Sequence, residues 1–424
     1  MQRSHVVDAY ATPLQPPTRI FDRWLAARLQ RAIAPAAVRL ELWDGTSPYS
    51  RDTSPIGSVL VHDRAALIGL IIDPDLSFGD AYTAGRVEIR GDLGTVVEAL
   101  TRAVLGPPTW RERLRGAVER PNSLAHSRRN VHHHYDLGND FYEQWLDEDF
   151  VYTCAYFEHP QMTLEAAQHA KFDLVSRKLR LQPGESVVEA GCGWGTLALH
   201  MARTYGVHVK AFNVSREQLA YARDRAEREG MTTDRVEFID DDYRNVRGGY
   251  DAFVSVGMLE HVGLHHYQSL SDVLRRVVRR KGGRGLLHFI GRDASRPLNA
   301  WTRRRIFPGA YAPTLAEVAT RVLAPSGMSI VDVENLRLHY ARTLAHWRAR
   351  FKNAEEQVRA RYGANFERAW DLYLAGSQAA FSTGWMQLFQ VVFVPLETAP
   401  PYWTRAEMYN EGPAKPVPAI DAKL

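Results

Sequence analysis

From residue 130 onward, short apolar runs of strand type alternate with longer segments of helical periodicity. The runs that we interpret as strands are 186–190, 207–212, 236–239, 252–256 and 285–290, followed by 329–334 and 385–394. Helical segments at 195–205, 215–229 and 267–280 separate most of the earlier runs. This alternation predicts an α/β fold built on a doubly wound, Rossmann-like sheet. Helical stretches within 292–322 and 341–383 are too long for ordinary connections, and we expect them to cover the carboxyl edge of the sheet as lids.

The first 105 residues follow a different pattern, which predicts a smaller N-terminal α+β domain. Strands are expected at 59–62, 66–72 and 87–89, and a turn with a short helix at 75–82. Gly106-Pro107-Pro108 marks a break in the chain. The predicted organisation is therefore an N-terminal domain over 1–105, a basic linker over 106–129 and a larger domain over 130–424.

Composition narrows the class of protein. Of the 424 residues 45% are hydrophobic, enough for a sizeable core, and the two cysteines cannot form a disulfide framework, which favours a reducing, cytoplasmic setting. The sequence contains no run of 18 apolar residues, so no membrane span is predicted. The net charge is only +4, but arginines cluster within 111–129, 275–281 and 303–305. Solvated helix faces explain such clusters, and so does contact with an anionic surface of lipid headgroups or nucleic acid.

The stretch Val187–Gly195 leads from a buried strand through a glycine-rich turn into a helix. Glycine permits the tight backbone path, and the missing side chains let a ligand approach the main chain. The glycines follow the spacing G-x-G-x-G, which differs from the G-x-G-x-x-G of dinucleotide-binding folds. The turn therefore indicates S-adenosylmethionine (SAM) as the ligand instead of NAD.

Polar segments follow the next two strands at the same edge of the sheet. Phe212–Gln218 lies where a ribose contact belongs, although Ser215 also fits a helix N-cap. In Asp240–Arg244, the aromatic ring of Tyr243 could pack on adenine while carboxylates accept hydrogen bonds from its amine. The shared placement of these segments is stronger evidence for a cofactor site than any one of them.

Acid–base residues follow the fourth and fifth strands. Glu260-His261 comes directly after the fourth strand, and His288 lies within the fifth. The cysteines lack metal-ligand spacing with these histidines, and contiguous His132–His134 cannot easily face one ion, so no metal site is predicted. The aromatic and small polar segments 134–142 and 152–157 are typical of a lid over a cofactor, in which Cys154 could act as a nucleophile if a base lay within reach.

Taken together, these motifs closely resemble the cyclopropane-fatty-acyl-phospholipid synthase family, which includes the mycolic acid cyclopropane synthases. The resemblance runs in order from about residue 129 to Val394. The segments that carry it are His134–Asn139, Tyr152–Phe157, Gly191–Gly195, Glu260-His261 and Ile306–Gly309. Residues Asp73–Tyr82 also resemble the extra domain of the phospholipid-acting members, which favours a membrane phospholipid substrate over a carrier-bound acyl chain.

The resemblance implies a class I SAM-dependent methyltransferase fold and a set of site residues. The bicarbonate-binding residues of the family correspond to Cys154, Glu260, His288, Ile290 and Tyr340. Its cofactor contacts correspond to Tyr152, Thr153, Gly191, Cys192, Gly193, Asn213, Val214, Ser215, Gln218, Tyr243 and Arg244. The chain departs from the family pattern at Thr153, Asn213 and Ala310, where Ser, Thr and Gly are usual. Thr153 keeps a hydroxyl, whereas Asn213 leaves the ribose-side contact open.

The implied reaction adds a methylene group from SAM to a cis double bond in a phospholipid acyl chain, with bicarbonate as the base. The implied partners are membrane phospholipids with unsaturated chains and a second copy of the chain, with which the protein would form a homodimer. The protein would be cytoplasmic and bound peripherally to the anionic inner face of the cell membrane. One alternative is methylation of the alkene without ring closure; another is a lipid- or SAM-binding protein without catalysis. A nucleic-acid methyltransferase would be expected to carry Asn/Asp-Pro-Pro-aromatic after the fourth strand, where this chain has Gly257-Met258-Leu259-Glu260, so no nucleic-acid partner is predicted.

Overall fold

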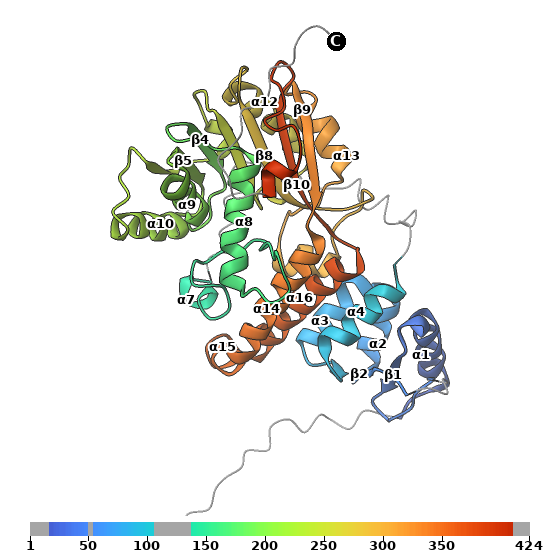
Figure 1. Ribbon diagram of the computed structural model, residues 1–424. Helices are drawn as coiled ribbons and strands as arrows, with labels where there is room; N and C mark the ends of the chain where they lie inside the picture. The colour runs from blue at the N-terminus through green and yellow to red at the C-terminus, as the bar shows by residue number, and fades with distance from the viewer. Residues whose placement is uncertain (1–16, 50–53, 106–136, 410–424) are drawn as a thin grey trace, which may run out of the picture.

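The structure, a computed structural model, describes residues 17–49, 54–105 and 137–409, which form two sheets with helices packed around them (Figure 1). The expected break at Gly106-Pro107-Pro108, the basic linker and His132–His134 lie outside the described residues.

The larger sheet has seven strands in the order β6-β5-β4-β7-β8-β10-β9. Its strands are β4 (Ser186–Ala190), β5 (His208–Asn213), β6 (Val236–Asp240), β7 (Ala252–Val256), β8 (Arg284–Gly291), β9 (Met328–Asn335) and β10 (Gln387–Pro395). The first five in the sheet order run parallel, whereas β10 is antiparallel to both of its neighbours. All seven strands predicted from the apolar runs are present within two residues at each end, and the doubly wound α/β fold is confirmed.

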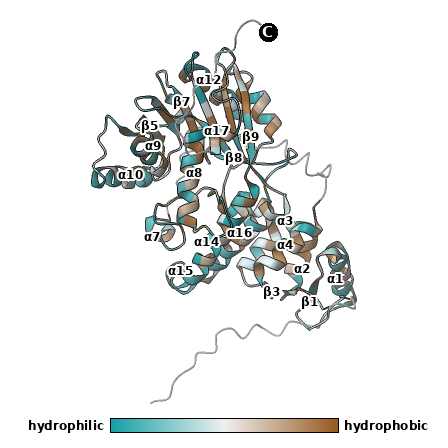
Figure 2. Ribbon diagram, viewed as in Figure 1, coloured by the Kyte–Doolittle hydropathy of each residue, from teal (hydrophilic) through white to brown (hydrophobic). Residues whose placement is uncertain are grey.

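Helices cover both faces of this sheet and give it three layers. Because successive strand residues point to opposite faces, Val187 packs with α8, α9 and α10, whereas Val188 packs with α12. The bounds are α8 (Leu164–Lys178), α9 (Thr196–Tyr205), α10 (Arg216–Arg228) and α12 (Tyr267–Val277). Figure 2 shows the outer helix α10 coloured mostly hydrophilic, as expected for a helix with one face in solvent.

A helical cap covers the carboxyl edge of the sheet below the strands in Figure 1. It consists of α14 (Arg337–Asn353), α15 (Glu355–Tyr362) and α16 (Ala364–Thr383). The predicted lid over 341–383 is therefore present, and its first helix begins four residues earlier than the start of that stretch. The stretch 292–322 is less regular than expected: it holds only α13 (Leu315–Val318) and the wide helical turns η4 (Thr302–Ile306) and η5 (Ala319–Leu323).

The N-terminal sheet has three strands, with β2 parallel to β1 and antiparallel to β3, and its own hydrophobic core. Its elements are α1 (Ile20–Ala32), η1 (Ala34–Ala36), β1 (Val38–Leu42), β2 (Gly57–Val61), α2 (Arg64–Ile72), α3 (Pro74–Thr83), β3 (Val87–Arg90) and α4 (Leu93–Ala103). The strand expected at 66–72 is wrong, because these residues belong to helix α2. Asp63 caps that helix by accepting from the backbone N–H of Ala66 at 2.8 Å, and the run of Leu and Ile suits a buried helix as well as a strand.

The N-terminal domain packs through α3 and α4 against α16 of the cap (Figure 1). The guanidinium of Arg368 lies 4.3 Å from the ring centroid of Tyr82 and donates to the carbonyls of Tyr82 and Val87 at 2.7 and 3.0 Å. Gly79 lies against Trp301, where any Cβ atom would come within 2.3 Å of the indole ring. Asp80 pairs with Arg305 at 2.9 Å. The motif at Asp73–Tyr82 thus forms much of the contact between the two domains.

Candidate active site

A cavity lies where β4, β5, β6 and β7 end at the carboxyl edge of the large sheet. Its walls include the lid segment before α8, the glycine turn after β4 and the polar segments after β5 and β6. The predicted cofactor residues that line it are Tyr152, Thr153, Gly191, Cys192, Gly193, Asn213, Val214, Gln218, Tyr243 and Arg244. Ser215 is the exception: its side chain is buried and caps α10 by accepting from the backbone N–H of Gln218.

The glycine turn exposes its backbone to this cavity. Gly191 and Gly193 adopt positive φ angles of 83° and 55°, a conformation that disfavours residues with a side chain. A Cβ atom on Gly193 would meet no protein atom within 4 Å, so the space beside it belongs to the cavity. At Gly191 such an atom would come within 3.0 Å of Met258. The turn therefore leaves room for a ligand to approach the main chain beside Gly193.

Asn213 braces the turn from inside the protein. Its amide N–H2 donates to the carbonyl of Gly193 at 3.1 Å and to the side-chain oxygen of Gln218 at 2.9 Å. Its side-chain oxygen accepts from the backbone N–H groups of Val214 and Ser215. Because these bonds occupy both ends of the amide, the side chain fixes the shape of the cradle and is poorly placed to make the ribose contact expected of this position.

The segment after β6 supplies the far wall. Asp242 holds the Arg244 guanidinium through bonds of 2.7 and 2.9 Å, and both residues line the cavity. The Tyr243 hydroxyl is buried and has no hydrogen-bond partner in the described part of the chain, and burial raises its pKa. An unsatisfied hydroxyl beside a cavity is what a bound polar group would correct.

Two buried charged residues also line the cavity: Glu189, the acidic residue just before the glycine turn, and Lys171 of α8, which the sequence motifs did not single out. The Lys171 ammonium donates to the Thr153 hydroxyl at 2.9 Å, which ties helix α8 to the lid. Burial lowers the pKa of Lys171 to about 8 and raises that of Glu189 to about 8, and each group favours the charged form of the other. Glu189 Oε2 has no hydrogen-bond partner among the described residues, so the pair leaves an acceptor near the cofactor cavity.

Glu260 lies in a second group of residues, around β8. Its Oε1 accepts from the backbone N–H of Ile290 at 2.5 Å, which places the carboxyl beside the end of that strand. Oε2 is buried and without a partner in the described residues, and burial raises the pKa of the carboxyl to about 7. The neighbouring His261 lines the cofactor cavity, and burial lowers its pKa to about 4. Glu260 therefore keeps one oxygen available for a ligand.

His288 is held in one tautomer by residues from three other elements. Gln390 and Glu334 lie beside it in register on β10 and β9. The Lys178 ammonium, from α8, donates to the Gln390 side-chain oxygen at 2.7 Å and pairs with Glu334 at 2.5 Å.

Because a lysine can only donate, the Gln390 oxygen faces Lys178 and its N–H2 faces His288 Nδ1, at 3.1 Å. His288 Nδ1 must then accept, so the neutral ring carries its proton on Nε2. Burial holds the pKa of His288 well below its ordinary value, so the ring stays neutral. Nε2 has no partner in the described part of the chain. The site thus presents a fixed N–H donor on β8, the strand to whose end the Glu260 carboxyl is bonded.

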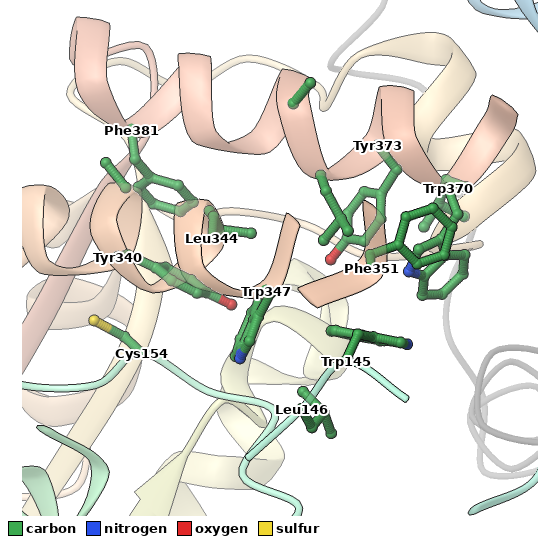
Figure 3. Close-up of a cluster of buried hydrophobic side chains, with 14 of the residues drawn as sticks. Trp145, Leu146, Cys154, Tyr340, Leu344, Trp347, Phe351, Trp370, Tyr373 and Phe381 are labelled. Atoms are coloured by element: carbon green, nitrogen blue, oxygen red, sulfur yellow. The ribbon is translucent and has the colours of Figure 1, made fainter. Parts of the chain in front are cut away.

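Cys154 and Tyr340 lie on facing elements in an aromatic cluster (Figure 3). The Tyr340 ring packs on Phe381 and Trp347 with centroids 4.6 and 5.9 Å apart. Burial raises the pKa of the Cys154 thiol, which stays protonated, so the possible role as a thiolate nucleophile is not supported. The thiol, Ile290 and Tyr340 belong to one contiguous apolar cluster that also contains Tyr152 of the cofactor cavity. Sequence-predicted catalytic and cofactor residues therefore meet at this edge of the sheet.

Several of the clustered arginines are engaged within the protein. Arg276 donates to the carbonyls of Arg244 and Val246, Arg279 pairs with Asp251, and Arg305 pairs with Asp80. The cluster within 111–129 lies outside the described residues. No group of three or more His, Cys, Asp or Glu side chains arranged for a metal is found in the residues that the structure describes. Across those residues, no helix has both the length and the apolarity needed to cross a bilayer.

Comparisons with known proteins identify the family of this chain. The mycolic acid cyclopropane synthetase family matches residues 122–391, and a domain family of unknown function matches residues 26–104. The chain is 36% identical to a probable fatty acid methyltransferase of Pseudomonas putida, over 88% of this chain and 96% of the relative. It is also 36% identical to the cyclopropane-fatty-acyl-phospholipid synthase of Escherichia coli K12, over 61% of this chain and 66% of that one.

Solved structures extend the likeness to the fold. Mycolic acid cyclopropane synthase CmaA1 in complex with SAH and CTAB has 29% sequence identity and a TM-score of 0.58, and the match covers 63% of this chain and 97% of CmaA1. The sheet and the glycine turn define a class I SAM-dependent methyltransferase. Within that class, the chain belongs to the mycolic acid cyclopropane synthetase family.

Proposed function

We propose that this enzyme adds a methylene group from SAM to the cis double bond of an unsaturated phospholipid acyl chain and closes a cyclopropane ring, with bicarbonate as the base. The observation that carries the proposal is the pair of unsatisfied buried atoms, Glu260 Oε2 and His288 Nε2–H, on residues that belong to β8 or bond to its end. One is an acceptor when ionised and the other a donor. A buried polar group without a partner costs about 1–3 kcal/mol, so a ligand that satisfies both is favoured.

Bicarbonate fits this pair because it has one hydroxyl and two oxygens that share one negative charge. Its hydroxyl would donate to Glu260, while an oxygen would accept from His288 Nε2–H. The protonated Cys154 thiol and the Tyr340 side chain border the same apolar cluster. Bound in this way, bicarbonate would supply a base for a proton of the transferred methyl group. Burial first, and then the Lys171 and Lys178 ammonium groups, lower the pKa of His288, and the same two cations would favour a bound anion.

SAM would be held by the exposed backbone of the glycine turn and by the polar groups around it, and when bound it supplies an electrophilic methyl group. Two buried atoms of residues that line the cofactor cavity, Tyr243 OH and Glu189 Oε2, lack hydrogen-bond partners among the described residues. The hydroxyl could donate to the bound cofactor, and the carboxyl oxygen could accept from it. An alkene is a poor nucleophile, so the protein must hold the chain close and in line with the methyl group. Such positioning contributes on the order of 7–11 kcal/mol at best.

The aromatic cluster suits the cationic character that an alkylated double bond acquires. Trp145 and Trp347 are fully buried, and Tyr340 is 8% exposed, so these rings exclude water that would quench a carbocation. Aromatic faces also attract a cation, by about 0.5–2 kcal/mol for each contact. The lid and the cap therefore provide a dry, electron-rich wall next to the methyl donor.

Alkene methylation without ring closure is the second candidate, supported by the Pseudomonas putida relative that is named a probable fatty acid methyltransferase. It differs in what precedes proton loss: a ring closes when the transferred methyl group loses its proton at once, whereas a hydride shift that first moves the cation to the methylated carbon leads to a methylene branch. A base held at a fixed position by Glu260 and His288 favours immediate proton loss from the methyl group, before a hydride shift. A protein that only binds lipid or SAM has no use for such a pair.

The substrate class is tested with purified enzyme, SAM and vesicles of a cis-monounsaturated phospholipid. We expect mass spectrometry to show acyl chains that gain one CH2, no gain in saturated phospholipid, and a slower reaction with the free unsaturated fatty acid. Buffer stripped of CO2 should slow the reaction, and added bicarbonate should restore it. A faster reaction with the free acid would overturn the phospholipid assignment, and indifference to bicarbonate would overturn the choice of base.

A further inference from the structure

Helix α1 carries its largest hydrophobic side chains on the outside of the molecule. Ile20, Phe21 and Trp24 are 88%, 56% and 52% exposed, and the two rings stack with centroids 6.1 Å apart. The core-facing side of the same helix is formed by other residues, including Leu25 and Ala26. Exposed apolar groups gathered in this way mark interaction sites more often than single exposed residues do.

The charged residues of α1 are distributed unevenly. Arg23, Arg28 and Arg31 are exposed and lie on the outer side with the aromatic residues. The only acidic residue of the helix, Asp22, has a fully buried side chain and pairs with Arg64 of α2 at 2.7 Å. Near the start of the helix, Asp44 is exposed, but its carboxylate accepts from the backbone N–H of Thr18 at 3.2 Å and from that of Thr46 at 3.0 Å. The outer face of α1 is therefore apolar and cationic.

We propose that this outer face, formed by Ile20, Phe21, Trp24, Arg23, Arg28 and Arg31, docks on an anionic phospholipid bilayer. The proposal rests on the proposed function, which places the substrate in a bilayer. Aromatic and aliphatic groups insert at the boundary of headgroups and acyl chains, while arginines keep their charge at the phosphates and lay their methylene stems on apolar surface. An anionic leaflet attracts cations of this kind within about 10 Å at moderate salt.

A bilayer fits this face better than a second copy of the chain does. A two-fold contact would set this cationic face against an identical one, and the one acidic residue of α1, Asp22, is buried and cannot offset the repulsion between like charges. A helix of 13 residues is about 20 Å long, short for an interface of about 800 Å² per partner. Figure 1 shows α1 on the side of the N-terminal domain away from α16, so docking there leaves the contact with the cap intact.

Vesicle flotation tests the proposal with full-length enzyme. Phe21→Ala combined with Trp24→Ala, and Arg28→Glu combined with Arg31→Glu, change only exposed side chains, so the fold should survive. We expect each pair to reduce binding to phosphatidylglycerol-containing vesicles by about tenfold or more. Raised salt should weaken binding of the wild type. Trp403→Ala, which removes a side chain that is 68% exposed outside this domain, should bind as the wild type does.

Turnover separates docking from catalysis. Both α1 variants should modify vesicle lipid more slowly but act normally on the same phospholipid in detergent micelles. If the α1 variants bind vesicles as strongly as the wild type does, docking through α1 is refuted, even if lipid is modified normally. Docking through α1 is also overturned if the variants change only the oligomeric state seen by sedimentation. A wild type that binds vesicles but modifies no lipid would instead refute the proposed function and leave the docking face standing.

Discussion

Replacing Glu260 with Gln is expected to lower kcat by about 10²–10⁴-fold, the range over which a positioned acid or base contributes. The variant keeps the shape of the side chain and the bond from the Ile290 N–H to Oε1. It replaces the unsatisfied Oε2 acceptor by an N–H2 donor, which cannot accept from the bicarbonate hydroxyl. Steady-state turnover of unsaturated phospholipid measures the effect.

Two checks separate this loss from damage to the fold. Glu356→Gln, at an exposed position on α15, should leave kcat and thermal stability unchanged. The pH profile supplies the second check. Because burial raises the Glu260 pKa to about 7, the carboxylate is lost as pH falls through 7, and kcat/KM should fall with it when the bicarbonate concentration is held constant. The Gln variant should lack this acid limb; a variant within about threefold of wild-type activity would remove Glu260 from the mechanism.

Replacing Gln390 with Glu should reverse the tautomer of His288 without removing a side chain. A carboxylate at this position still accepts from Lys178, but it can no longer donate to His288 Nδ1. The ring then moves its proton to Nδ1, so that Nε2 becomes an acceptor facing the anion. Outer residues that orient a ligand typically contribute about 10–100-fold to activity, and we expect kcat to fall by that amount.

Spectroscopy tests this account independently of turnover. Nitrogen NMR of labelled histidine should report the proton on Nε2 in the wild type and on Nδ1 in the Glu variant. Gln387→Glu is a matched change on the same strand, at a residue that bonds Asn335 and lies away from His288 in the register. It should change neither the tautomer nor the dependence of rate on bicarbonate. An unchanged His288 tautomer in the Gln390 variant would refute the relay from Lys178 through Gln390.

The inner strands of the large sheet could be predicted because they are continuous apolar runs buried on both faces, such as 252–256, and the outer strands β5, β6 and β9 still carry enough apolar residues to be recognised. The glycine turn and Glu260 could also be placed, since both follow directly after such runs at the same sheet edge. The prediction for 66–72 was wrong because the local pattern is ambiguous. The apolar residues of α2 suit a strand or a helix, and only the Asp63 cap and tertiary packing decide between them. Ser215 fitted two roles, and the structure places it at the helix cap.

The residues missed by sequence reasoning act through contacts between distant segments. Lys178 and Gln390 are 212 positions apart in the chain, and no spacing rule brings them together. Lys171 lies among apolar residues of α8, and a lysine at a buried helical position is the one local signal that could have drawn attention to it. The docking face on α1 was missed because no helix was predicted there. Clustered arginines drew attention elsewhere, although Arg276, Arg279 and Arg305 are engaged within the protein.

The most direct test of ring closure is proton NMR of the product lipid, because a ring and an added methylene branch have the same mass. Purified enzyme, SAM and a cis-monounsaturated phospholipid should give a product with upfield cyclopropane protons and no remaining alkene signal in the converted chains. Vinylidene signals in that spectrum would contradict the account. They would show that a hydride shift moves the cation to the methylated carbon before the methyl group loses its proton, and that Glu260 and His288 do not direct ring closure.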